Sequence, residues 1–223
     1  MPLSLRPATE EDSPHIGRIG AASFADSVSR VFFPENRRHL SPVGDAFLDE
    51  AEWRASRNTR RMKEGRPTFV VVDRTEDGKE EVVVGFAQWD PPKRQPEQPA
   101  AATTMKSEAD GTQDPLPACL DQSALKAAFE AIETETQKVL GPEGYSKMWY
   151  LMILGVDPKH HRRGIGKILV NKGLELAKQD GKDVYLIATP NGQKLYESVG
   201  FKAIGEGCYL GDVAHYSMLW RNE

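Results

Sequence analysis

The segment between residues 157 and 167 is basic and contains two glycines, and it holds the residue types best suited to bind an anion. A helical pattern begins near Gly164, and the first N–H groups of a helix have no helical partner and carry partial positive charge. Glycines also let a bulky anion approach the backbone closely. The segment therefore predicts a site for a phosphate or pyrophosphate group. Its charged side chains and glycines are Arg162, Arg163, Gly164, Gly166 and Lys167.

Two common nucleotide-binding patterns do not fit this segment. A P-loop requires Gly, four residues, Gly-Lys and then Ser or Thr. Here Ile168 follows Lys167, so the hydroxyl that would hold magnesium is missing, and no glycine lies five residues before Gly166. A Rossmann fingerprint fails on the number and the spacing of its glycines. The anion site must therefore belong to another class of protein.

Alternating strands and helices are expected to position this segment. Near-continuous apolar runs at 149–156 and 184–188 are typical of strands buried on both faces. Helical spacing follows each run, at 164–179 and at 191–199. This order predicts an α/β fold, a mixed sheet with helices on both faces. The other expected elements are strands at 3–6, 68–72, 82–89, 201–204 and 215–220, and helices after Thr9, at 45–64 and after Asp121.

A proline-rich stretch interrupts this pattern between the hairpin and the helix that Asp121 begins. Residues 91–117 hold six of the 15 prolines, and the stretch has few apolar side chains to offset its ordering entropy. We predict one domain over residues 1–223 with a flexible insertion at about residues 91–120. The strand before the insertion still needs partners, so the insertion is not a domain boundary.

Composition excludes several classes of protein. A net charge of −4 is unlike a dedicated nucleic-acid binder. Two cysteines in 223 residues cannot form a disulfide framework, and no apolar run approaches the roughly 20 residues that span a bilayer. We therefore expect a cytoplasmic protein with no nucleic-acid partner and no membrane association. No metal site is predicted, because no standard spacing is matched by His160, His161, Cys208 and His215.

Three blocks in the right order carry a resemblance to a known family. His161-Arg-Arg-Gly-Ile-Gly166 resembles the family pattern Gln/Arg-x-x-Gly-x-Gly/Ala. The block from Ala188 ends in Leu-Tyr-Glu-Ser-Val-Gly-Phe201, and the opening reads Leu5-Arg-Pro-Ala-Thr, with Asp12 after two further residues. The chain thus resembles the GCN5-related N-acetyltransferase (GNAT) superfamily and is similar to fungal GNAT-domain acetyltransferases.

The resemblance implies a GNAT fold, with a twisted mixed sheet of about seven strands splayed between strands 4 and 5. It implies acetyl-CoA as co-substrate, held in the splay. The pantetheine arm would pair with the backbone of Leu154, Gly155 and Val156, and Asn191 would hydrogen-bond the arm. The pyrophosphate would lie on the loop that comprises His161, Arg162, Arg163, Gly164, Ile165, Gly166 and Lys167.

The resemblance also implies catalytic roles. The N–H of Val156 would stabilise the oxyanion, and Tyr196 would protonate the departing thiolate, although Tyr196 also suits a packing role. His161 stands where the family usually has Gln or Arg. The strand positions where similar sequences often have glutamates hold Met152 and Ile187, so the base is unassigned. Asp90, Glu35, His215 or an ordered water remain open for that role.

The implied activity is direct transfer of an acetyl group from acetyl-CoA to a primary amine, most simply on a small molecule. A CoA-binding protein without transfer activity and a protein N-terminal or lysine acetyltransferase are the alternatives. Either a monomer or a homodimer fits the sequence. The acceptor would be shaped by residues 24–66 and 89–121, in which the candidate pocket-wall residues are Phe32, Phe33, Phe47 and Trp53.

Overall fold

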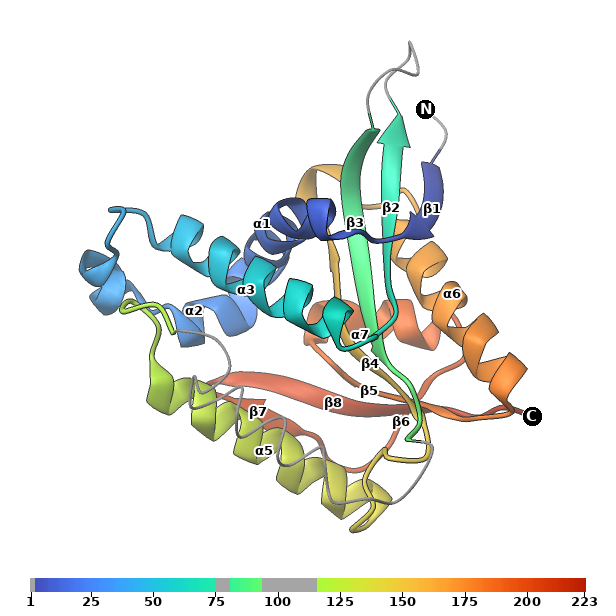
Figure 1. Cartoon of the computed structure of the whole chain (residues 1–223). Helices are drawn as coiled ribbons and strands as arrows, with labels where there is room; N and C mark the ends of the chain where they lie inside the picture. Colours follow the sequence, from blue (N-terminus) through green and yellow to red (C-terminus); the bar gives the residue numbers. More distant parts are fainter. Residues whose placement is uncertain (1–2, 75–80, 94–115) are drawn as a thin grey trace.

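The computed structural model describes residues 3–74, 81–93 and 116–223, and these residues form one mixed sheet with helices on both faces (Figure 1). The sheet has eight strands in the order β1-β2-β3-β4-β5-β8-β6, with β7 paired to β8. The strands are β1 (Leu3–Pro7), β2 (Thr68–Arg74), β3 (Glu81–Asp90), β4 (Trp149–Val156), β5 (Val184–Ala188), β6 (Lys202–Ala203), β7 (Cys208–Leu210) and β8 (Val213–Trp220). The α-helices are α1 (Ser13–Ser23), α2 (Arg30–Phe32), α3 (Ala46–Lys63), α5 (Gln122–Leu140), α6 (Ile165–Asp180) and α7 (Pro190–Glu197).

The helices divide between the two faces of the sheet according to the alternation of side chains along the strands. On one face Val70 and Val72 of β2 pack with Ile16 and Ile19 of α1. On the other face Val71 packs in the large core cluster that includes the apolar residues of α6 and α7. Figure 1 shows α3 and α5 in front of the sheet with α1, and α6 behind its right-hand side. The predicted fold is therefore confirmed.

The sheet opens between β4 and β5, as predicted. These strands pair in parallel at only three positions, the last of which is Leu151 with Leu186. Immediately beyond, the register with β3 shifts, because Gln88 lies opposite Ile153 whereas Trp89 lies opposite Leu151. Met152 is thus an extra residue, a bulge, and bulges bend and twist the strand that carries them. The bulge explains why β4 leaves β5 at this point.

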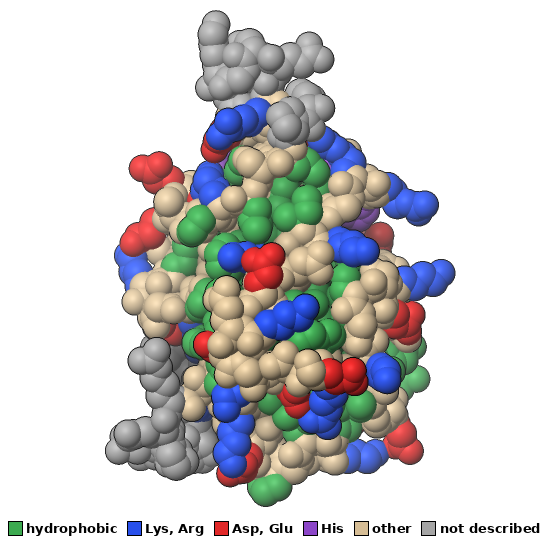
Figure 2. All heavy atoms as spheres, turned by 90° about the vertical axis from the view of Figure 1, so that its right-hand side faces the viewer, with side chains coloured by type: hydrophobic (Ala, Val, Ile, Leu, Met, Phe, Trp, Pro, Cys, Tyr) green, Lys and Arg blue, Asp and Glu red, His purple; other side chains and the backbone are tan. Residues whose placement is uncertain are grey.

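Close packing fixes α6 behind this opening. A Cβ atom at Gly173 would lie 2.1 Å from the indole ring of Trp89, which is fully buried on β3. The side of the molecule that carries α6 and the C-terminus has basic and acidic side chains interspersed over its surface (Figure 2). No helix within the described ranges has both the length and the hydropathy to cross a membrane.

Some expectations need correction. β7 was not predicted, because its three residues are too few to show a period. Phe47, a candidate pocket-wall residue by sequence, is instead 43% exposed. Residues 94–115 of the predicted insertion lie outside the described residues. The end of the insertion packs instead, since Cys119 and Leu120 are buried with Trp53 and Leu125.

Candidate active site

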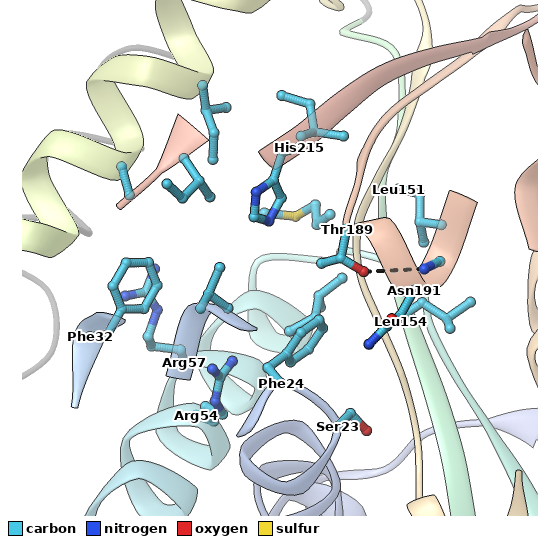
Figure 3. A pocket seen from close by; sticks show the side chains of 18 of the residues that line it. Ser23, Phe24, Phe32, Arg54, Arg57, Leu151, Leu154, Thr189, Asn191 and His215 are labelled. Atoms are coloured by element: carbon cyan, nitrogen blue, oxygen red, sulfur yellow. Dashed lines mark hydrogen bonds between the residues drawn. The ribbon is translucent and has the colours of Figure 1, made fainter. Parts of the chain in front are cut away.

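A cavity of about 340 Å³ lies where β4 and β5 separate (Figure 3). One wall is the splay itself, with Leu154 and Val156 of β4 and Ile187 of β5. The opposite wall is formed by α3 and α5, which contribute aromatic, aliphatic and arginine side chains. The cavity therefore reaches both the loop before α6 and the helices on the other face. The remaining polar residues of the lining include Ser23, Asn58, His161, Thr189, Asn191, Tyr196 and His215.

The backbone of β4 faces the cavity at Leu154 and Val156. At the opposite edge of β4, the N–H of Asp157 donates to the carbonyl of Val84 at 2.9 Å. In an antiparallel pair, alternate residues direct their N–H and C=O groups to the partner strand. The groups of Gly155 therefore bond β3, and those of Leu154 and Val156 point away from it, into the splay. Gly155 is thus a structural residue here, not a backbone contact for a ligand.

The carbonyl of Val156 already has two donors. Ser23 Oγ donates to it at 2.9 Å, and His161 Nε2 lies 3.1 Å from it. Because a carbonyl only accepts, His161 must carry its proton on Nε2. This bond turns the His161 ring toward the end of β4, which departs from the expectation that its side chain contacts phosphate. The N–H of Val156 and both backbone groups of Leu154 remain directed at the cavity.

The loop before α6 adopts an unusual backbone. Arg162 has φ 67°, the sole non-glycine residue with positive φ in the described part of the chain, and Gly164 has φ 78°. No side chain caps α6 at Gly164, and its first helical bond joins Ile168 N–H to Gly164 C=O at 3.1 Å. The N–H groups of the first turn are thus left for an external acceptor. A Cβ at Gly164 would meet open space, which leaves room for a bulky group.

The side chains of this loop differ in what they offer an anion. Arg163 is bound to Asp73 of β2 and to His160, so its charge is already compensated. The Arg163 guanidinium holds the pKa of Asp73 below its ordinary value, although burial acts in the opposite direction. Arg162 and Lys167 are exposed. Two positive side chains, rather than the three that the sequence suggests, are therefore available.

Two further residues of the predicted loop have packing roles. The Ile165 side chain is 1% exposed within the large core cluster, so only its backbone can meet a ligand. A Cβ at Gly166 would lie 2.8 Å from a methyl group of Leu195, so this glycine permits α6 to approach α7. The close approach of backbone to anion thus depends on Gly164, and Gly166 sets the helix packing.

Helix α7 brings Asn191, near its start, and Tyr196, near its end, to the cavity. Thr189 caps the helix, and its Oγ1 accepts from Gly192 N–H at 3.3 Å (Figure 3). Tyr196 lines the cavity but is only 8% exposed, with its ring edge-on to Phe201 at 5.8 Å. Burial raises the pKa of the Tyr196 phenol above its ordinary value. The phenol therefore keeps its proton across the whole neutral range.

The side of the cavity opposite the loop is aromatic and positively charged. Phe32 and Trp53 line it as expected, whereas Phe33 is buried elsewhere in the core and Phe47 lies outside it. Arg54, Arg57 and Arg61 of α3 also line it, at a helical spacing that sequence inspection could have detected. Arg54 is bound to Glu50 at 2.7 Å, and Arg57 lies over the Trp53 ring at 4.5 Å. No Asp or Glu belongs to the lining over the described ranges.

The candidate bases are now distinguishable by position. Met152 and Ile187 both line the cavity, which agrees with the expected location of those two strand positions, and neither can accept a proton. Asp90 and Glu35 are not among the lining residues that the structure describes. His215 is among them, and its ring points from β8 into the cavity (Figure 3). Sequence spacing gave no reason to prefer His215.

Comparison with known proteins identifies relatives of this chain. Residues 122–221, which include β4, the basic loop, α6 and α7, match a protein-family model described as "Acetyltransferase (GNAT) domain". A protein of Stachybotrys chartarum named "Acetyltransferase" is 27% identical over 203 residues, which cover 91% of this chain and 82% of that protein. The loop before α6 and one wall of the cavity thus lie within the region that the family model matches.

Solved structures share the fold. One is a Corynebacterium glutamicum structure described as "histone acetyltransferase HPA2 and related acetyltransferase". It has a TM-score of 0.59 at 19% identity and covers 99% of this chain and 97% of its own. The PaiA N-acetyltransferase of Thermoplasma acidophilum, solved in complex with coenzyme A, has a TM-score of 0.53 at 12% identity and covers 99% of each chain. At these identities the likeness is one of fold.

Proposed function

Because this chain belongs to the GNAT acetyltransferase superfamily, and is thus an acyltransferase, we propose that it transfers an acetyl group from acetyl-CoA directly to a primary amine of a small molecule. The observation that carries the proposal is the cavity at the splay. There, unpaired backbone groups of β4 and a buried phenol meet one space, and the lining residue His161 leads into the uncapped start of α6.

Acetyl-CoA would occupy the loop side of this cavity. Its pyrophosphate would accept from the free N–H groups of Gly166 and Lys167, with Arg162 and Lys167 adding positive charge. Its pantetheine amides would bond the backbone of Leu154, and Asn191 at the start of α7 would support the arm. In favour of this placement, the Thermoplasma relative of the same fold was solved with coenzyme A.

The cavity offers two of the three groups that acetyl transfer needs. The N–H of Val156 points into the splay and would donate to the oxyanion that forms as nitrogen attacks the thioester carbon. Tyr196, protonated at neutral pH because burial raises its pKa, would donate a proton to the departing thiolate. The third group, a base for the attacking amine, is not supplied by Met152 or Ile187.

The wall of arginines and aromatic rings narrows the class of acceptor. Polyamines and aminoglycosides carry several positive charges, and the described part of the lining holds no Asp or Glu to bind them. An amine with an aromatic or apolar body would pack against Phe24, Phe32 and Phe129 instead. These features support a small aromatic or apolar amine over a polycation.

A CoA-binding protein without transfer activity is the second candidate, and the apolar residues Met152 and Ile187 favour it. One experiment separates the two candidates. The protein is mixed with acetyl-CoA and single amines, and thiol release and the mass of the acylated product are followed. The panel comprises arylalkylamines, arylamines, amino acids, a polyamine, an aminoglycoside and peptides with a free N-terminus or lysine.

We expect amine-dependent thiol release that is largest for the aromatic amines. Acetyl-CoA binding without thiol release from any amine would instead establish the second candidate. Efficient acetylation of the peptides alone would favour a protein acceptor and would contradict the small-molecule proposal.

A further inference from the structure

The geometry points to His215 as the general base that takes the proton from the ammonium group of the acceptor. This inference rests on the proposed function, because it concerns a step of the same reaction. It assigns the one role for which the two splayed strands offer only Met152 and Ile187. Three observations carry it: the state of the ring, its place on the sheet, and the composition of the cavity wall.

The ring of His215 is held in one tautomer. Its Nδ1 lies 3.0 Å from the carbonyl of Val213, and a carbonyl only accepts, so Nδ1 carries the proton. In the neutral ring Nε2 is then an unprotonated acceptor. His215 is 4% exposed, yet it lines the cavity, and its ring points toward the side where Phe24 and Arg57 lie (Figure 3). The lone pair of a fixed imidazole is thus available within the cavity.

Strand register places His215 beside the positions that lack a base. Ser217 of β8 pairs with Ile187 of β5, and residues directly opposite each other share a face of the sheet. His215, two residues earlier on β8, lies on that same face. It is beside Thr189, the residue that follows the end of β5. The neighbouring strand therefore brings a base to the end of β5.

The groups around His215 keep it neutral. Burial lowers its pKa below the ordinary 6.5, although the hydrogen bond to Val213 opposes the shift. Cys208 of β7 is its register partner, and burial raises the pKa of that thiol to about 11, so the thiol carries no charge at neutral pH. Glu135 of α5 is bound to Ser217 and to the N–H of Gly207. Arg57 of α3 lines the same cavity.

No other described group of the lining fits the role. The lining contains no Asp or Glu over the described ranges. His161, whose Nε2 donates to the Val156 carbonyl, belongs to the loop before α6, on the side proposed for the cofactor. The tyrosine of α7 keeps its proton, because burial raises the pKa of Tyr196. His215 is therefore the described lining residue with an available basic lone pair on the acceptor side.

The step balances as follows. The acceptor enters as an ammonium ion and gives one proton to His215 Nε2, which later releases it to solvent. The neutral amine attacks the thioester carbon, the C–N bond forms, and the C–S bond breaks. Tyr196 gives one proton to the CoA thiolate. The second proton that the nitrogen loses as the amide forms replaces it on Tyr196, through solvent. One ammonium ion and one thioester thus become one amide, one thiol and one proton.

The test is the variant His215→Gln, whose amide can still donate to the Val213 carbonyl. With an alkylamine acceptor, kcat/KM at pH 7 should fall about 10²- to 10⁴-fold. The native enzyme should lose activity as pH falls through the pKa of His215. As pH rises toward the pKa of the amine, the activity of the variant should instead increase in proportion to the neutral fraction of the amine. Its deficit should shrink at high pH and with an arylamine, which is already neutral at pH 7.

The matched control is His15→Gln, at an exposed position of α1, which should keep the native pH profile. Acetyl-CoA binding by His215→Gln should match the native protein, since the ring lies on the acceptor side. If the variant does not fold, ¹⁵N NMR of the native histidines serves instead. We expect a neutral His215 ring protonated at Nδ1 that titrates below 6.5.

Turnover by His215→Gln within about threefold of native at pH 7, with an unchanged pH profile, would overturn the assignment while leaving the acetyltransferase function intact. A neutral ring protonated at Nε2 would also overturn it. No turnover by the native protein with any amine would instead remove the proposed function itself.

Discussion

Tyr196 packs in the core and has a proposed role as an acid, and its environment allows the two roles to be separated. The ring packs against Phe201, whereas the described residues show no hydrogen-bond partner for the hydroxyl. Tyr196→Phe removes the acid and keeps the packing. We expect kcat to fall about 10²- to 10⁴-fold, with little change in acetyl-CoA affinity, in steady-state assays with the best amine of the panel.

Because burial raises the pKa of Tyr196, loss of its proton should not limit activity up to about pH 10. The native profile should therefore show no basic limb from this group within the stable pH range. A Phe variant within about threefold of native kcat, a difference of about 0.7 kcal/mol, would make Tyr196 structural and assign the proton to water.

Gly164 allows a second test at single-residue scale. Gly164→Asp places a negative side chain where pyrophosphate would lie, so acetyl-CoA should no longer raise the melting temperature. Gly181 at the other end of α6 is a matched control, since it also has a positive φ and open space around its Cβ position. Gly181→Asp carries the same backbone strain without approaching the loop.

Thermal unfolding with and without acetyl-CoA measures both variants. We expect the ligand-induced shift to be lost in Gly164→Asp and retained in Gly181→Asp. Equal shifts in the two variants would contradict the position of the pyrophosphate at the start of α6.

Among the elements, those with strong local patterns were predictable from sequence. The bounds of β4 and β5 match the apolar runs, and Asp121 caps α5 as expected. β7 was not predictable, because it depends on pairing with β8 rather than on its own residues. Phe47 was misjudged because composition identifies apolar side chains but not the helix face that meets the core. Local sequence patterns do not show which distant segments pack together.

The same limit applies to the candidate site. The uncapped start of α6 was predictable because helix-start chemistry is local, and Gly164 has open space around its Cβ position. Arg163 was misjudged because Asp73 lies 90 residues away in the chain. The hydrogen bond from Ser23 Oγ to the Val156 carbonyl joins residues 133 apart in the chain, and no sequence pattern predicts it. Partners so distant become visible only in the folded sheet.

The packing of α6 on β3 gives a prediction for an element. A methyl group at Gly173 would overlap the Trp89 ring, so Gly173→Ala should destabilise the protein by about 1–3 kcal/mol despite its higher helix propensity. Asn171→Ala, at an exposed position of the same helix, should be neutral or slightly stabilising. Urea unfolding measures both changes. Equal stabilities would show that α6 can shift away from the sheet.

Across the whole molecule, the two halves of the chain divide the work. The second half, matched by the family model, carries the splay, the basic loop and α7. The first half supplies α1, which reaches the end of β4 through Ser23, and α3 with its arginines. We infer that the first half contributes to the choice of acceptor, and that the second half binds the cofactor and adds α5 and His215 to the acceptor side.

Acid stability is a property of the whole molecule that depends on how β1 joins α1. Asp12 is buried and bound by Arg6 at 2.8 and 2.9 Å and by the Thr9 N–H at 2.8 Å. Burial alone would raise the pKa of Asp12, but these bonds lower it below the ordinary 3.8. Its stabilisation is therefore fully present well above pH 3.8 and is lost as pH falls below that value through the lower pKa of the folded protein.

Asp12→Asn should cost about 1.5–3 kcal/mol at pH 7, the range for hydrogen bonds to charged groups. It should also flatten the decline in the free energy of unfolding between about pH 5 and pH 3. Urea unfolding at several pH values measures this, with the exposed Asp26→Asn as a control that keeps the native slope. A decline as steep in Asp12→Asn as in the native protein would refute the assignment.

The bulge at Met152 gives the molecule a strand edge inside its own sheet. Exposed edges invite pairing with other chains, but here the edge is short and walled by helices, so a foreign strand with side chains on both faces would not fit. A thin chain bearing two amides would fit. Ligand binding would then complete the sheet, and the Leu154 amide should exchange its hydrogen slowly only in the occupied protein.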